Sequence, residues 1–135
     1  MDTKNFFRLA PALERFRKQR GVSQKAAALA AGIDATRLSA IERGRVVGPG
    51  KDFVERLIRT IEMTPDEADL LAELAARDRV MREVIRNFPP AAHAFLDAAL
   101  DAAQVLAAED VAEAERGLRQ MVQAKVRLQA FVARA

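Results

Sequence analysis

The stretch Ser23–Arg45, SQKAAALAAGIDATRLSAIERGR, predicts two short helices joined by a tight turn. Gly32 lies where this turn needs a residue that tolerates a positive φ angle. Leu38 and Ile41, three residues apart, predict a narrow apolar stripe on the second helix. Apolar residues at helical spacing predict the buried face of the first helix: Ala26, Leu29 and Ala30.

The outer face of the second helix is small, polar or basic in character. Its residues there are Ala35, Thr36, Arg37, Ser39, Ala40 and Arg43. A helix that buries one side and offers such groups on the other suits the major groove of DNA. We therefore expect a helix-turn-helix module with its recognition helix over about residues 34–43.

Helix-capping signals support both helices. Ser23 is a natural N-cap for the first helix and Asp34 for the second, because both side chains accept hydrogen bonds from free backbone N–H groups. Gln24 and Lys25 then occupy a first helical turn, where outward-pointing N–H groups attract anions. These residues predict a phosphate anchor.

Composition excludes several kinds of site. The chain has 135 residues, half of them hydrophobic, and no cysteine, so disulfides, thiolate metal sites and cysteine nucleophiles are absent. His93 is the only histidine and is interpreted as a surface or packing residue. Paired acids such as Asp66/Glu67 are explained by helix starts. We expect no enzyme activity, no cofactor and no metal.

Charge is distributed unevenly along the chain. Residues 1–60 carry 13 Lys and Arg against 6 Asp and Glu, whereas residues 61–135 carry 9 against 13. A basic half joined to an acidic half is typical of a polyanion-binding domain linked to a solubilising or pairing region. No run of residues is apolar enough for a membrane span and no signal sequence is visible, so we expect a cytoplasmic protein, nucleoid-associated when bound to DNA.

The whole chain is predicted to be all-α, because strand patterns are almost absent. Beyond the opening stretch, helices are expected from Pro11 to about Arg20, from Lys51 to Glu62, and from Pro65 to Asn87 after the Thr64 cap. A loop is expected at residues 45–50. The expected buried residues outside the module are Leu9, Leu13, Phe16, Phe53, Val54, Leu57, Ile58, Ile61, Ala68, Leu71, Leu74, Val80, and Val84 or Ile85.

The composition changes after Phe88-Pro89-Pro90, which ends the long helix. We predict a DNA-binding domain over residues 1–88, with its core at 11–75, and a C-terminal helical hairpin over residues 89–135. The last helix, from about Val111 to Val132, carries apolar residues at alternating spacings of three and four, broken by Lys125. This hairpin either packs on its own domain or pairs with a second copy. We favour a homodimer through residues 91–132.

The segment from about Leu13 to Glu62 resembles the Cro-like phage-repressor (XRE) family of helix-turn-helix regulators. The residues that carry the resemblance are Arg17, Gly21-Val22-Ser23-Gln24, Ala30, Gly32-Ile33, Leu38, Ile41-Glu42 and Gly44. The family implies a five-helix domain whose third helix enters the major groove of double-stranded DNA.

The resemblance also implies roles for single residues. Gln24 would contact the DNA backbone or a base, and Arg17 would form a structural ion pair with Glu42. The implied base-reading positions are Ala35, Thr36 and Ala40, with Arg37 beside them, and the implied phosphate contacts are Arg43 and Arg45. Alanine at two reading positions cannot hydrogen-bond a base, so direct readout is expected to rest on Thr36 and Arg37, with part of the specificity read from DNA shape.

These observations predict a sequence-specific transcriptional regulator, a repressor, that binds a roughly palindromic operator as a homodimer. The alternative is an interaction protein, similar to an antitoxin or an adaptor, whose C-terminal helices bind a different protein. The sequence names neither the operator nor a controlling signal.

Overall fold

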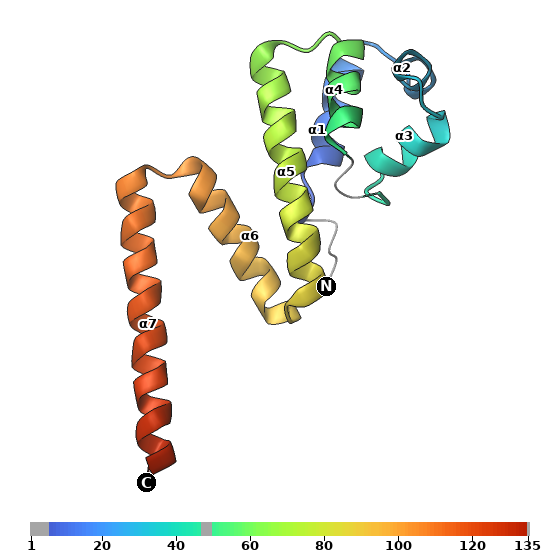
Figure 1. Ribbon diagram of the computed structural model, residues 1–135. Coiled ribbons are helices and arrows are strands. Elements are labelled where there is room, and N and C mark those ends of the chain that lie inside the picture. Colours follow the sequence, from blue (N-terminus) through green and yellow to red (C-terminus); the bar gives the residue numbers. More distant parts are fainter. Residues whose placement is uncertain (1–5, 47–49, 135) are drawn as a thin grey trace. The chain divides into compact units, whose positions relative to one another are not determined.

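The computed structural model describes residues 6–46 and 50–134, so the predicted loop at 45–50 and the N-terminal segment lie partly outside the described residues. Within these ranges the chain forms seven helices and no strand (Figure 1). Their bounds are α1 Leu9–Gln19, α2 Gln24–Ala31, α3 Ala35–Glu42, α4 Lys51–Thr60, α5 Pro65–Asn87, α6 Pro90–Val105 and α7 Ala108–Arg134. The all-α prediction is confirmed.

The chain divides into two compact units, residues 1–97 and 98–135. The division falls within α6, whose first turns belong to the first unit. The predicted domain boundary between residues 88 and 89 therefore stays a prediction. None of the described helices combines the length and the apolar character that crossing a membrane requires.

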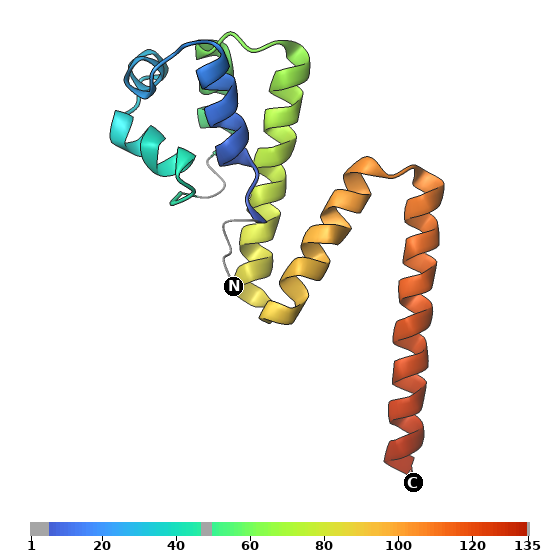
Figure 2. The same cartoon turned by 180° about the vertical axis from the view of Figure 1, so that it is seen from behind.

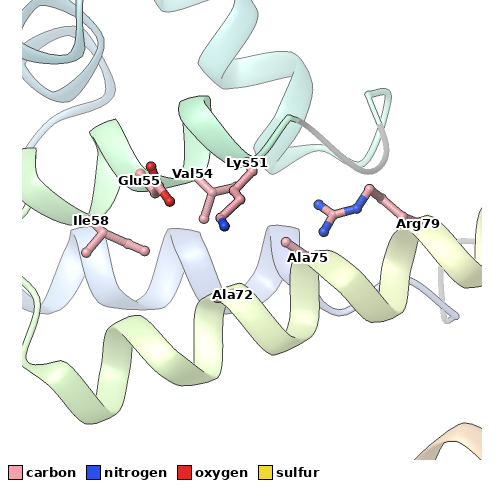
Figure 3. Close-up of a pocket in the computed structure, with 7 residues that line it drawn as sticks. All are labelled: Lys51, Val54, Glu55, Ile58, Ala72, Ala75 and Arg79. Carbon is pink, nitrogen blue, oxygen red and sulfur yellow. The ribbon is translucent and has the colours of Figure 1, made fainter.

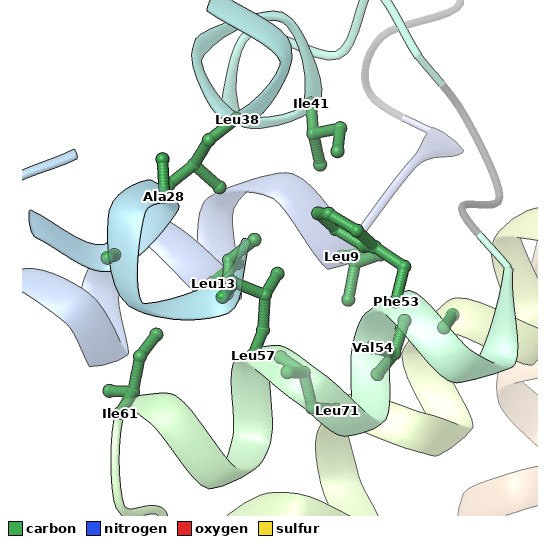
Figure 4. Packing of buried hydrophobic residues seen from close by; sticks show 13 residues of the cluster. Leu9, Leu13, Ala28, Leu38, Ile41, Phe53, Val54, Leu57, Ile61 and Leu71 are labelled. Atoms are coloured by element: carbon green, nitrogen blue, oxygen red, sulfur yellow. The ribbon is translucent and has the colours of Figure 1, made fainter. Parts of the chain in front are cut away.

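Five helices of the first unit pack around one hydrophobic core. α5 lies along α1 and α4, while α3 packs on α1 and α2, and α2 also contacts α4 (Figures 1 and 2). Side chains from all five helices meet in the centre, as Figure 4 shows for Leu13, Ala28, Leu38, Leu57 and Leu71. Full burial of each such side chain stabilises the fold by about 1.5–3 kcal/mol.

Most predicted core residues are buried, but the predicted face of α2 is wrong. The structure buries Ala27, Ala28 and Ala31, whereas Leu29 is 80% exposed and Ala26 and Ala30 are also exposed. The run AAALAA is apolar at every position, so its periodicity gives no contrast between faces. Methyl side chains on the inner face let α2 lie close to α3 and α4.

The predicted bounds of α5 are confirmed, but the prediction of which residues it buries is partly wrong. Leu71 and Val84 are buried as expected, but Val80 is 47% exposed. The inner face includes Arg77 and Asp78, which a search for apolar residues passes over. The remaining predicted residues, Ala68, Leu74 and Ile85, are half-buried.

α1 begins at Leu9 rather than at Pro11, because a residue of α5 caps it. The carboxylate of Asp78 accepts hydrogen bonds from the backbone N–H groups of Arg8 and Leu9, each at 2.9 Å. Free N–H groups at a helix start need such a partner, and Arg8 supplies no side-chain cap of its own. Burial raises the pKa of Asp78, and these two N–H groups oppose that effect.

The start of α6 is held to the first unit by polar contacts and one aromatic contact. The guanidinium of the buried Arg77 pairs with Asp97 and donates to the carbonyl oxygen of Phe6 at 2.9 Å. His93 is buried, lies 2.7 Å from the carbonyl oxygen of Phe88 through Nε2, and packs edge-on against Phe6. His93 thus has a packing role, in line with its interpretation from the sequence.

Candidate nucleic-acid interface

α2 and α3 are short helices joined by a tight turn at Gly32. Gly32 has a φ of +70°, in the left-handed region that glycine adopts without strain. The Ser23 hydroxyl accepts a hydrogen bond from the Ala26 N–H at 3.0 Å, and the Asp34 carboxylate accepts from the Thr36 N–H at 2.9 Å. The two predicted N-caps are confirmed, and they fix where each helix begins.

The inner side of α3 is anchored in the core. Leu38 and Ile41 are almost completely buried, as predicted, among residues of α1, α2 and α4. Because these two residues point inward, the opposite side of α3 faces solvent. This orientation is set by packing and does not depend on a ligand.

An ion pair joins α1 to the last residue of α3. Arg17 Nη2 lies 2.8 Å from Glu42 Oε1, and Arg17 Nε lies 3.1 Å from both carboxylate oxygens. Arg17 Nη1 also donates to the carbonyl oxygen of Val22 at 2.7 Å, just before α2. Both side chains are buried, so one guanidinium ties together α1, the segment leading into α2, and α3.

The residues predicted to contact DNA lie on α2, on α3 and just after α3. Thr36, Arg37, Arg43, Arg45 and Lys25 are exposed. Gln24 is half-buried at the start of α2, and Ala35 and Ala40 are half-buried on α3. The first turn of α3 brings together Ala35, Thr36 and Arg37.

Arg37 makes a contact that the sequence did not predict. Its guanidinium carbon lies 5.2 Å above the ring centre of Phe53, in a cation–π arrangement. Phe53 comes from α4 and is itself buried, so the ring is a fixed platform. No pattern within one helix could reveal this contact, because it joins α3 to the next helix, α4.

Two basic residues at the end of α1 form ion pairs within the protein. Lys18 Nζ lies 2.7 Å from Glu14, and Arg20, directly after α1, pairs with Glu67 of α5. The hydrogen bond from Arg20 lowers the pKa of Glu67 to about 2, with a smaller contribution from the Thr64 N–H. Glu67 also completes the predicted capping box with Thr64, so Arg20 connects α1 to the start of α5.

A shallow pocket of about 270 Å³ lies between α4 and α5, and none of the predicted DNA-contacting residues lines it (Figure 3). Val54, Ile58 and two alanines form its walls, with charged side chains at its edge. Within the described residues, every buried side-chain nitrogen or oxygen has a hydrogen-bond partner. The pocket therefore gives no indication of a particular ligand.

Comparison with known families agrees with this geometry. Residues 8–71 match the family model described as a helix-turn-helix domain, from the start of α1 into α5. The N-terminal part of this chain carries a helix-turn-helix domain. No curated protein and no solved structure matches the chain significantly. The helix-turn-helix domain contains every residue predicted for the DNA interface and the ion pair between Arg17 and Glu42.

Proposed function

We propose that this protein is a sequence-specific DNA-binding transcriptional regulator of the Cro-like phage-repressor (XRE) type, acting as a repressor. α3 is its recognition helix and enters the major groove of double-stranded DNA. The observation that carries the proposal is that contacts within the protein fix the position of α3. Its inner side is buried in the core, and Asp34 caps its first turn. Its last residue, Glu42, forms a buried ion pair with Arg17. A preorganised helix loses little entropy on binding.

The exposed side chains divide into two roles in this proposal. Thr36 and Arg37 read base edges from the first turn of α3, where a recognition helix approaches the bases. Arg37 is suited to O6 and N7 of guanine, because its planar guanidinium donates two parallel hydrogen bonds. Its stacking on Phe53 limits its freedom before it meets DNA.

The remaining contacts are to phosphate. Lys25 and Gln24 at the start of α2, with Arg43 and Arg45 after α3, are the proposed phosphate contacts. Phosphate contacts supply affinity without sequence information and weaken steeply as salt increases. Ala35 and Ala40 allow close approach of the backbone and can contact a thymine methyl group.

The proposed active form is a homodimer on a roughly palindromic site. A single short recognition helix with two alanines on its reading face discriminates weakly, and two-fold repetition doubles the number of base pairs read. The exposed apolar side chains of α7 support this part of the proposal, because an uncovered apolar surface marks an interaction site. No catalytic role is proposed.

Selection of bound duplexes from random DNA tests the function. We expect an enriched motif of two inverted half-sites whose centres are separated by about 10 base pairs, one helical turn, or a multiple of it. A set of recovered sequences with no common motif would contradict sequence-specific recognition. An enriched single half-site would support recognition but contradict the palindromic dimer.

A second function is favoured by the same exposed face of α7. The C-terminal helices could bind a different protein, as in an antitoxin or an adaptor, while the helix-turn-helix domain holds DNA. Light scattering on the purified chain separates the two functions: a stable homodimer supports the regulator, whereas a monomer that dimerises only with a foreign partner supports the adaptor.

A further inference from the structure

Most of the uncovered apolar residues of α7 lie on one face of this long helix. Every described residue of α7 after Ala112 is exposed. Large apolar side chains along it are between 40% and 72% exposed: Leu118, Met121, Val122, Val126, Leu128, Phe131 and Val132. Such a face costs free energy in water and is typical of an interface.

The spacing of this face is that of a helix-pairing seam. The positions Val111, Ala114, Leu118, Met121, Lys125, Leu128 and Val132 alternate by three and four residues. This spacing keeps one edge of a helix against a partner helix over its length. The partner is therefore expected to be another helix that runs along α7.

The charges of α7 are separated along its length. Residues 109–115 contain four acids, Glu109, Asp110, Glu113 and Glu115, whereas residues 116–134 contain five bases and no acid. Favourable interaction with the helix dipole explains charges in the first and last turns only. Glu113, Glu115, Arg119 and Lys125 lie farther in, so their arrangement needs another explanation.

We infer that α7 pairs with α7 of a second copy in antiparallel orientation. This orientation places the acidic first part of each helix against the basic second part of the other, whereas a parallel pair places like charges side by side. In the register that aligns both seams, Leu118 lies opposite Met121 of the second copy. Val111 then lies opposite Leu128 of the second copy.

Lys125 decides between the two orientations. It interrupts the apolar seam, so a parallel pair in register would place two ammonium groups opposite each other. In the antiparallel register Lys125 lies opposite the small Ala114 and next to Glu115 of the second copy. Glu115 pairs with Arg119 of its own helix at 2.9 Å, but both side chains are more than half exposed, so this weak pair can rearrange.

The inference deepens the proposed homodimer and rests on that part of the proposed function. It defines the surface, the orientation and the residues that select a second copy rather than a foreign helix. It is independent of which DNA sequence α3 reads.

Disulfide trapping in the full chain tests the orientation directly, since the native chain has no cysteine. Val111→Cys and Leu128→Cys are made separately and oxidised alone and as a mixture. The antiparallel pair predicts little covalent dimer from either variant alone and a mixed dimer linking positions 111 and 128 from the mixture. Residues 111 of the two copies would be about 25 Å apart along the helix axis, too far for a disulfide.

Exchange of charges tests the role of Lys125. Lys125→Glu and Glu115→Lys are each expected to raise the dimer Kd about tenfold, because two attractive pairs become repulsive. The double variant is expected to restore dimerisation. Glu113→Lys is the matched control, since it makes the same charge change on the side of the helix away from the seam.

Other outcomes would overturn the inference. Efficient disulfide formation by Val111→Cys alone indicates a parallel pair, and no disulfide in any mixture indicates that α7 does not pair with itself. Circular dichroism checks that each variant keeps its helices. All these measurements are made without DNA. A failure of the proposed DNA recognition would therefore not change their results, and a failure of α7 pairing would be detected independently of DNA binding.

Discussion

At the residue scale, the most consequential side chain of the helix-turn-helix domain is Arg17. It binds Glu42 through three contacts and also holds the Val22 carbonyl, and both members of the pair are buried. The sequence alone would interpret Arg17, one of several basic residues near the end of α1, as a surface residue. The resemblance to a family supplied the pairing, because spacing along one helix cannot show a contact with another.

Arg17→Met is predicted to destabilise the protein by about 3–5 kcal/mol, because it leaves the Glu42 carboxylate buried without a partner. Denaturation in urea measures the change. Lys18→Met is the matched control, since Lys18 makes an exposed pair with Glu14 and its loss should cost about 1 kcal/mol or less. Adding Glu42→Gln to Arg17→Met should recover part of the stability. Equal effects of Arg17→Met and Lys18→Met would show that the pair is not structural.

Glu67 gives a prediction about pH. Its pKa falls from an ordinary 4.5 to about 2 in the folded protein, chiefly through the hydrogen bond from Arg20. A lowered carboxyl pKa contributes stability that is complete above about pH 4.5 and disappears as the pH falls towards 2. Glu67→Gln keeps a capping-box side chain but loses the charge. The variant should therefore lower the melting temperature at pH 7 and have little effect near pH 2; a difference that does not depend on pH would contradict the assignment.

At the element scale, the sequence was most informative where local chemistry decides a helix boundary. The capping box at Thr64 and the prolines after Phe88 predicted α5 with its observed bounds, Pro65–Asn87. Ser23 and Asp34 likewise fixed the starts of α2 and α3. The buried face of each helix was less predictable. Most residues of α2 are apolar, so only the packing of the neighbouring helices determines that Ala27, Ala28 and Ala31 are its buried residues.

The start of α1 shows how one helix can depend on another. Asp78→Asn is predicted to destabilise the protein by about 1–3 kcal/mol, because an amide nitrogen would replace one of the two oxygens that accept from the Arg8 and Leu9 N–H groups. Urea denaturation gives the free energy, and hydrogen exchange at the first amides of α1 should become faster. Unchanged exchange at these amides would show that Asp78 is not their cap.

Asp69→Asn provides the comparison for that prediction. Asp69 lies on the same helix, is exposed, and has no contact with the start of α1 among the described interactions. Its substitution should change stability by less than about 0.5 kcal/mol. An equal loss in both variants would indicate a general effect of charge on α5.

At the scale of the whole molecule, the division of charge seen in the sequence does not coincide with the two units of the structure. The acidic excess of the second half of the sequence lies in residues 61–97 of the first unit, whereas residues 98–135 carry five acids and five bases. The sequence did not predict that α6 begins within the first unit, since this depends on Arg77, Asp97 and His93, which are brought together only by tertiary packing.

The proposed function depends most on Arg37, through which we propose that α3 reads the DNA sequence. The affinity of Arg37→Ala for the selected operator and for unrelated DNA, measured by fluorescence anisotropy at one salt concentration, tests it most directly. Arg45→Ala is the matched control and should weaken binding to both DNAs alike, as loss of a phosphate contact does. For Arg37→Ala we predict a loss of about tenfold or more on the operator and little loss on unrelated DNA. An unchanged ratio of the two affinities would contradict the claim.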